Sequence, residues 1–339
     1  MIKKVILPLL IVFSFENALA KMGKPTGEMD AVLKTLESQK GKPIETLSAQ
    51  EARKQPTPAD AVKTLMKNKK IEAQPLVTVK DIKVDGGDGQ IPARIYTPAG
   101  ANKPMPVVVY FHGGGWVLAD NDTYDATPRS LADKTKAIFV SIEYRKAPEY
   151  KFPAAHEDAY AAYQWVLKNA RTFDGDPKRV AVAGESAGGN LALNVAIRAR
   201  DEKIQMPVHE LIVYPVAGNY LSTSSYKENA NAKPLNRDMM TWFMNQYLHS
   251  TSERDDKRIN LLKANFQHLN NATIITAQID PLRTEGKELA EIMKSYGVDV
   301  KYKNFKGVTH EFFGMAPVLK EAREAQEMAS KELTKSFKQ

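Results

Sequence analysis

The sequence predicts an α/β protein in which a mainly parallel sheet of eight strands is covered by helices on both faces. Short and nearly continuous apolar runs alternate with helical stretches after about residue 76, which is typical of parallel strands buried on both sides. Of the 339 residues, 43% are hydrophobic and 26% are charged, so the chain can bury a sizeable core. Two glycine-rich segments directly follow two of the apolar runs, and they carry the residues that point to a function.

The first twenty residues have the layout of a secretory signal peptide. Lys3 and Lys4 precede an apolar run over 5–15, and Ala18-Leu19-Ala20 is a typical cleavage site. The apolar run is shorter than the ~20 residues that span a bilayer, which argues against a membrane anchor as the alternative. We therefore expect residues 1–20 to be removed near Ala20. The remaining protein should be exported, to the periplasm or outside the cell, without stable membrane insertion.

Residues 21–75 predict a helical N-terminal arm. One amphipathic helix is expected early in this segment, and a second is expected around 61–66, after Pro58. A proline-containing connection separates them. Such an arm must pack on another part of the chain to bury its apolar stripe. The stripe of the first helix comprises Met29, Val32, Leu33 and Leu36.

The chain from residue 76 predicts the sheet itself. Alternating apolar residues over 77–84 and 91–96, separated by a glycine-rich turn at 86–89, indicate an antiparallel hairpin. Six further apolar runs predict parallel strands, so residues 76–218 and 263–339 should form one α/β domain. The six runs are 107–111, 138–142, 180–183, 211–214, 273–279 and 300–305.

Residues 219–262 interrupt the alternation of strands and helices. They contain no predicted strand, but apolar residues over 239–247 predict an amphipathic helix. This insertion can be a lid that joins the N-terminal arm in a helical cap over a site. Alternatively, it is an ordinary surface helix whose methionines and aromatic residues serve only packing.

The net charge of +8 raises the question of a nucleic-acid partner. The lysines are dispersed and often stand beside acidic residues, as Lys287 does between Glu285 and Glu288. Mixed faces of this kind are typical of a solvated surface, so we expect no nucleic-acid partner. Cysteine is absent, which excludes disulfides, thiolate chemistry and cysteine ligands for metals.

The first glycine-rich segment that carries chemistry is Gly184-Glu185-Ser186-Ala187-Gly188, between the apolar run at 180–183 and a helical stretch. G-x-S-x-G in this context is a nucleophile elbow, in which glycines permit a sharp turn that exposes the serine hydroxyl. Ser186 is the predicted nucleophile, and the amide of Ala187 is predicted to stabilise an oxyanion. The alternative of a phosphate loop lacks the lysine that such a loop requires.

The second glycine-rich segment is His112-Gly113-Gly114-Gly115-Trp116, which follows the apolar run at 107–111. H-G-G-G after a strand is the oxyanion loop of lipases and esterases. Gly113 and Gly114 are the predicted amide donors, and Gly115 could replace one of them. His112 precedes the serine in the chain, so we expect it to hydrogen-bond the backbone and shape the loop rather than act as the base.

A nucleophilic serine needs a histidine base and a carboxylate that orients it, which in this arrangement follow the serine as acid and then histidine. His310 and Asp280 both come after predicted strands, at the carboxyl edge of the sheet where Ser186 lies. The rival acid Asp299 begins a strand and should lie at the opposite edge. The sequence therefore predicts Ser186, Asp280 and His310 as the catalytic triad. The other histidines after the serine are His209, His249 and His268.

With these motifs, the chain resembles the bacterial hormone-sensitive-lipase-like esterases (family IV) of the α/β-hydrolase superfamily over about residues 27–315. The resemblance implies the α/β-hydrolase fold, a helical cap formed by the arm and the insertion, and a triad at the residues already chosen. The family usually has Asp at Glu185, Gly at Glu311 and Leu at Lys146. Glu185 keeps the charge, whereas Glu311 places a carboxylate beside the base, where it can shift the pKa of the base or disfavour acidic substrates. The matching segments are His112–Trp116, Glu143–Glu149, Phe152–Ala155, Gly184–Asn190, Asp280–Arg283, Gly307–His310 and, in the arm, Leu47–Arg53.

The predicted activity is hydrolysis of short- to medium-chain carboxylic esters through an acyl-enzyme, without a metal or organic cofactor. An amidase, lactonase or peptidase with the same triad is the alternative, and a non-catalytic binding module is a more distant one. The expected partner is a small-molecule ester. The sequence leaves the natural substrate and the oligomeric state open, with a homodimer as one option.

Overall fold

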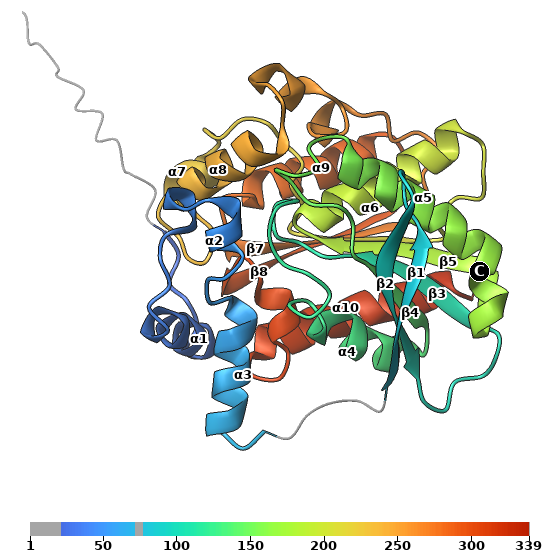
Figure 1. Ribbon diagram of the computed structural model, residues 1–339, viewed down its shortest axis with the longest axis horizontal. Helices are drawn as coiled ribbons and strands as arrows, with labels where there is room; N and C mark the ends of the chain where they lie inside the picture. Colours follow the sequence, from blue (N-terminus) through green and yellow to red (C-terminus); the bar gives the residue numbers. More distant parts are fainter. Residues whose placement is uncertain (1–21, 72–76, 339) are drawn as a thin grey trace, which may run out of the picture.

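The computed structural model describes residues 22–71 and 77–338 (Figure 1). These residues form one eight-stranded sheet with the strand order β1-β2-β4-β3-β5-β6-β7-β8. The predicted α/β class, with a mainly parallel sheet between helices, is confirmed. The expected signal peptide at 1–20 lies outside the described residues.

The sheet begins with an antiparallel hairpin, as predicted. β1 (Val77–Asp85) and β2 (Gln90–Pro98) pair along their whole lengths, from Val77 opposite Pro98 to Asp85 opposite Gln90. β1 is the edge strand, and most of its side chains remain accessible. β2 pairs antiparallel with β4, which joins the hairpin to the parallel strands.

The six remaining strands are mutually parallel. In the inner strands β4 and β6, every side chain is buried. β5 begins earlier than the apolar run predicted at 180–183. β8 continues beyond the run predicted at 300–305, because Thr309 still pairs with Ile279 of β7. This extension carries the chain directly to His310 at the carboxyl edge. The strands are β3 (Met105–Phe111), β4 (Ile138–Ile142), β5 (Gly175–Glu185), β6 (Glu210–Val213), β7 (Ala272–Ile279) and β8 (Val300–Thr309).

Helices cover both faces of the sheet (Figure 1). α4 (Ala126–Thr135) and α10 (Lys320–Ser336) contact each other on one face. α5 (Ala154–Asn169), α6 (Ala187–Asp201) and α9 (Arg283–Ser295) cover the other. Each face has its own cluster of buried apolar side chains, so the strands separate two halves of the core. Short 3₁₀ turns are η2 (Ala170–Phe173) and η5 (Phe312–Met315).

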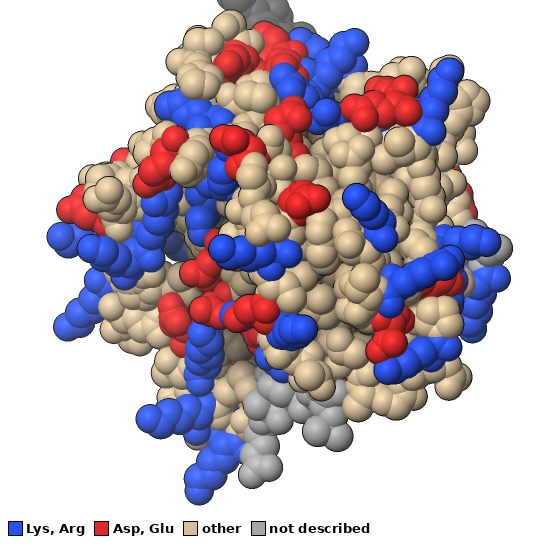
Figure 2. All heavy atoms as spheres, turned by 45° about the vertical axis from the view of Figure 1, so that its right-hand side comes forward, with Lys and Arg blue, Asp and Glu red and all other residues tan. Residues whose placement is uncertain are grey.

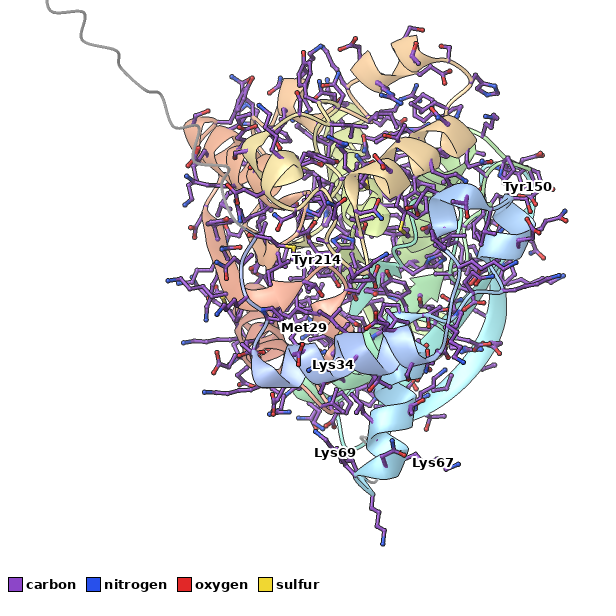
Figure 3. The ribbon with its side chains drawn as sticks, turned by 90° about the vertical axis from the view of Figure 1, so that its left-hand side faces the viewer. Met29, Lys34, Lys67, Lys69, Tyr150 and Tyr214 are labelled. Carbon is purple, nitrogen blue, oxygen red and sulfur yellow. The ribbon has the colours of Figure 1, made fainter. Side chains whose placement is uncertain are left out.

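The N-terminal arm contains the two predicted helices, α1 (Gly27–Ser38) and α3 (Pro58–Asn68). The hydroxyls of Thr26 and Thr57 accept hydrogen bonds from backbone amides in their first turns, which fixes where the helices begin. Met29 and Val32 bury the apolar stripe in the same half of the core as α4 and α10. Figure 3 shows α1 and α3 together on this side of the molecule, with Lys34, Lys67 and Lys69 on the arm.

The connection between α1 and α3 holds more structure than the sequence predicts. It contains η1 (Ile44–Thr46) and a short helix, α2 (Ala49–Ala52), which begins with a capping box between Ser48 and Glu51. Arg53 then ties the arm to the sheet domain. Its guanidinium pairs with both carboxylate oxygens of Glu149 at 2.7 and 2.8 Å, and it donates to the carbonyls of Ala147 and Val117.

The insertion contains no strand among its described residues 219–262, in line with the prediction. It holds the expected helix, α8 (Arg237–Tyr247), and a short helix, α7 (Ser224–Glu228), that the sequence did not suggest. The indole of Trp242 donates to the carbonyl of Leu47 at 3.0 Å, so the insertion meets the arm. Figure 1 shows α2, α7 and α8 on the same side of the molecule. The 3₁₀ turns of this region are η3 (Thr251–Asp255) and η4 (Leu261–Lys263).

The surface shows charges of both signs. On the face drawn in Figure 2, lysine and arginine side chains are scattered and interspersed with aspartate and glutamate. This distribution agrees with the dispersed charges of the sequence. Over residues 22–71 and 77–338, no helix has both the length and the apolar character needed to cross a membrane.

Candidate active site

Ser186 stands on a sharp turn between β5 and α6. Its backbone has φ 57° and ψ −119°, a conformation that residues with a Cβ rarely adopt. The turn is so tight that a Cβ at Gly184 would collide with the Gly188 carbonyl, and one at Gly188 would collide with the Phe111 carbonyl. The predicted elbow geometry is therefore present. The expected exposure of the hydroxyl is wrong, because surrounding segments cover the turn and leave Ser186 only 5% exposed.

The three residues predicted as a triad lie in hydrogen-bond contact. His310 Nε2 lies 3.0 Å from Ser186 Oγ, and His310 Nδ1 lies 2.7 Å from Asp280 Oδ2. All three side chains are buried. The imidazole can thus take a proton from the serine on one side while a carboxylate accepts a hydrogen bond from its other nitrogen.

The loop that carries Asp280 is held by neighbours that the sequence reasoning missed. Asp280 Oδ1 accepts from the Leu282 amide at 2.8 Å, which fixes the carboxylate. Two residues of the insertion hold the backbone of this loop. The Ser225 hydroxyl, in α7, donates to the Pro281 carbonyl at 2.6 Å. The side-chain amide of Asn229, directly after α7, donates to the Asp280 carbonyl at 3.2 Å. No periodicity or motif marked Ser225 and Asn229, because their role depends on a contact across more than fifty residues.

The glycine loop lies beside the elbow, since Phe111 of β3 pairs with Gly184 of β5. Among the described residues, no backbone acceptor takes a hydrogen bond from the amides of Gly113, Gly114 or Ala187. A Cβ at Gly115 would collide with the ring of Phe243 from α8, so the insertion packs directly on this loop.

His112 contacts the backbone of the loop, as predicted. Its Nδ1 lies 2.8 Å from the Gly113 carbonyl. The hydroxyl of Tyr144, within the matching segment Glu143–Glu149, also lies within hydrogen-bond distance of the carbonyls of His112 and Gly113, at 2.9 and 3.0 Å. Burial lowers the pKa of His112, which keeps this imidazole neutral at pH 7.

The rival residues lie away from the serine. His249 and His268 are exposed on the surface, and His209 is buried between Ser336 and Thr273. Asp299 precedes β8 and, together with His209, lines a small cleft at the opposite edge of the sheet. None of these four side chains contacts Ser186 among the described residues.

The charge on His310 is controlled by its neighbours. Burial alone would lower its pKa, but the carboxylate of Asp280, supported by Glu311 and Glu185, raises the pKa above the usual 6.5. Glu311 Oε1 lies 3.9 Å from His310 Nε2, so the unusual residue after the histidine does place a carboxyl beside the base. Both oxygens of Glu311 lie within hydrogen-bond distance of the Tyr124 hydroxyl, at 2.6 and 2.7 Å.

Glu185 differs from its expected behaviour. It accepts hydrogen bonds from the hydroxyls of Tyr110 and Tyr214, yet burial raises its pKa to about 7. Near neutral pH the carboxyl is therefore partly protonated, because the loss of hydration outweighs the hydrogen bonds that favour its charge. Lys146, the third departure, pairs with Glu143 at 2.6 Å and donates to the Ala119 carbonyl.

In the part of the chain that the structure describes, no three histidine, aspartate or glutamate side chains come together as a candidate metal site.

A mainly parallel eight-stranded sheet with a serine, a histidine and an aspartate in hydrogen-bond relay at its carboxyl edge is the arrangement of an α/β hydrolase. A model of the alpha/beta hydrolase fold family matches residues 108–314. The chain belongs to this family, and its resemblance to the hormone-sensitive-lipase-like esterases is confirmed.

Relatives cover most of the described fold. Carboxylesterase NlhH of Mycobacterium tuberculosis is 40% identical over 246 residues, which cover 71% of this chain and 77% of the relative. Ethyl acetate hydrolase of Pseudomonas putida is 30% identical over 287 residues, covering 83% and 88%. Among solved structures, a hyperthermophilic esterase from the archaeon Pyrobaculum calidifontis has a TM-score of 0.84 at 35% identity, covering 92% of this chain and 98% of that one.

Proposed function

We propose that this protein is a carboxylesterase that cleaves short- to medium-chain acyl esters through an acyl-enzyme. The relay from Ser186 Oγ through His310 to Asp280 is the observation that carries the proposal, with distances of 3.0 and 2.7 Å. Relatives named as a carboxylesterase and an ethyl acetate hydrolase support ester hydrolysis as the reaction.

In the proposed reaction, Ser186 Oγ attacks the ester carbonyl carbon as its proton passes to His310 Nε2. Asp280 accepts the hydrogen bond from Nδ1–H and stabilises the imidazolium. The amides of Gly113, Gly114 and Ala187 donate to the oxyanion, each contributing about 3 kcal/mol to the stability of the transition state. His310 then protonates the leaving alcohol, and water hydrolyses the acyl-enzyme by the same route.

Substitution of the serine tests this proposal. Ser186→Ala should leave a folded protein that no longer reacts with a fluorophosphonate probe and loses at least about a thousandfold in kcat on p-nitrophenyl butyrate. Circular dichroism of the variant checks the fold. Residual activity above about a tenth of wild type would contradict the assignment of Ser186 as nucleophile.

We further propose that the arm (21–75) and the insertion (219–262) form a cap that limits the acyl chain. The contacts of Trp242 with Leu47 and of Phe243 with Gly115 support this arrangement. On p-nitrophenyl esters from acetate to palmitate, kcat/KM should be highest between about two and eight carbons, since each methylene that fits contributes at most ~0.8 kcal/mol. A higher kcat/KM on palmitate than on butyrate would favour a lipase instead.

Export is a separate proposal that rests on the sequence of residues 1–20. Cleavage after Ala20 would yield a protein that begins at Lys21. N-terminal sequencing of protein purified from its native host tests this. An intact Met1 in a cytoplasmic fraction would contradict it.

A further inference from the structure

A cavity that the proposed reaction leaves unused lies beside the triad, between α3 of the arm and the segment that leads into α4. Its volume is about 300 Å³. Apolar side chains of α3 and of the segment around η5 form its walls, among them Val62, Met66 and Met315. The cavity can therefore hold the hydrocarbon part of a small molecule.

The inner end of this cavity is acidic. Glu185 and Glu311, the neighbours of the nucleophile and of the base in the chain, both line it. Their hydrogen-bond donors are the hydroxyls of Tyr110, Tyr214 and Tyr124, which carry no positive charge. Because no positive charge comes from these donors, the two carboxyl groups favour binding of a cationic group of a ligand.

The cations at the rim do not offset this acidity. Arg129 pairs with Asp125 at 2.8 Å. Lys63 extends into solvent, with 67% of its side chain exposed, and lies 4.0 Å from Asp60. An incoming ammonium would thus meet two carboxyl groups without a lysine or arginine partner among the described lining residues, and it would favour their ionised form.

A third polar group, the Thr127 hydroxyl, faces the cavity beside Glu185 and Tyr110, and it lowers the pKa of both neighbours. Thr127 lines it and is only 1% exposed, yet its hydroxyl oxygen has no hydrogen-bond partner among the described residues. Buried hydroxyls are nearly always hydrogen-bonded, so this oxygen marks a position where a ligand can donate.

The cavity adjoins the reacting atoms. The Tyr124 hydroxyl that binds Glu311 lies against Gly113, where a Cβ would collide with it. Glu311 Oε1 lies 3.9 Å from His310 Nε2, the nitrogen that returns the proton to the leaving oxygen. A substituent on the leaving alcohol is therefore the part of an ester that can reach Glu311.

We propose that this cavity binds the alcohol part of esters whose alcohol carries a protonated amine. The apolar walls hold the carbon substituents, Glu311 and Glu185 attract the positive charge, and the Thr127 hydroxyl accepts the N–H. The proposal rests on the proposed esterase function and names its substrate class.

A pair of esters with the same shape tests the proposal. At pH 7, 2-(dimethylamino)ethyl acetate carries a protonated nitrogen where 3-methylbutyl acetate carries a CH group. With acetate release as the readout, wild-type kcat/KM should be at least about tenfold higher for the cationic ester, as expected for a hydrogen bond to a charged group. Glu311→Gln should reduce this ratio about tenfold, and Thr127→Val, which keeps the side-chain shape, should reduce it about threefold.

Glu288→Gln, an exposed carboxylate on α9, is the matched control and should keep the wild-type ratio. A wild-type ratio near one, with both esters cleaved, would overturn the cavity proposal and leave the esterase function intact. If Glu311→Gln does not fold, an unchanged ratio in Thr127→Val overturns the proposal and a reduced one supports it. Failure of the proposed function is distinct, because wild type would then cleave neither ester nor p-nitrophenyl acetate.

Discussion

His310 lies between two acidic side chains with different geometry. Asp280 meets Nδ1 in a hydrogen bond of 2.7 Å, whereas Glu311 approaches Nε2 at 3.9 Å from the side of the serine. Both favour the protonated imidazolium, and together they outweigh the effect of burial. The base is therefore ready to accept a proton, but it also stays protonated to a higher pH than a free histidine.

This balance predicts the pH dependence of the reaction. Only neutral His310 can accept the serine proton, so kcat/KM should fall on the acid side with an inflection above pH 6.5. Glu311→Gln removes a negative charge that favours the imidazolium, so the inflection should move to lower pH. A pH profile on p-nitrophenyl acetate measures this, with Glu288→Gln as the control. An inflection that stays in place or moves to higher pH would contradict the role assigned to Glu311.

The choice of base is tested separately, by comparing histidines. His310→Ala should lose at least about a thousandfold in kcat, since a triad acts as a unit. His249→Ala and His268→Ala should retain most activity, because both side chains are on the surface. Equal losses in all three variants would mean that another group is the base.

Among the elements, the N-terminal arm depends on a specific attachment. Arg53 joins α2 to the sheet domain through Glu149 and through the carbonyls of Ala147 and Val117. Its guanidinium lowers the pKa of the Glu149 carboxyl to about 2. The partial exposure of the pair limits what its charge interaction contributes, but the bonds to the two carbonyls add to it.

Arg53→Ala should therefore loosen the arm more than it lowers global stability. We expect a loss of about 1–3 kcal/mol, and faster hydrogen exchange and proteolysis within residues 27–68. Arg237→Ala is the matched control, because among the described residues the Arg237 guanidinium forms an ion pair only with Asp238, at 3.5 Å. Arm exchange rates equal to those of wild type would show that the apolar stripe alone holds the arm in place.

The stability of the whole molecule includes a cost from a buried acid. Glu210 is the first residue of β6 and only 1% exposed, and neither carboxyl oxygen has a hydrogen-bond partner among the described residues. Burial raises its pKa well above the usual 4.5. Because the folded state then binds a proton that the unfolded state releases, this residue makes stability fall as pH rises above 4.5, until the folded pKa is reached.

Glu210→Met should remove this cost while keeping a similar side-chain length. We expect a gain of about 1–3 kcal/mol at pH 7, seen as a higher Tm, and a smaller gain at pH 4. Urea denaturation at the two pH values measures the difference. An equal or lower stability of the variant at pH 7 would show that the carboxyl is compensated in a way its contacts do not reveal.

Much of the fold and of the candidate site could be predicted because the signals are local. The elbow around Ser186 and the glycine loop at 113–115 are contiguous, and each needs glycine for a steric reason that a single segment expresses. Asp280 and His310 directly follow the ends of β7 and β8, so both could be predicted to lie at the carboxyl edge of the sheet. The helix α2 was missed because it is too short for periodicity to reveal.

The sheet, its parallel strands and the three relay residues could all be predicted, because strand period and the motifs are legible within single segments and the order of the residues along the chain is given. How distant segments meet depends on the folded molecule as a whole. Tyr124 reaches Glu311 across 187 residues, and Trp242 reaches Leu47 across 195. The tertiary structure also determines that Ser186 is covered and that Glu185 has a pKa of about 7, because burial depends on every neighbour in space and not on the local sequence.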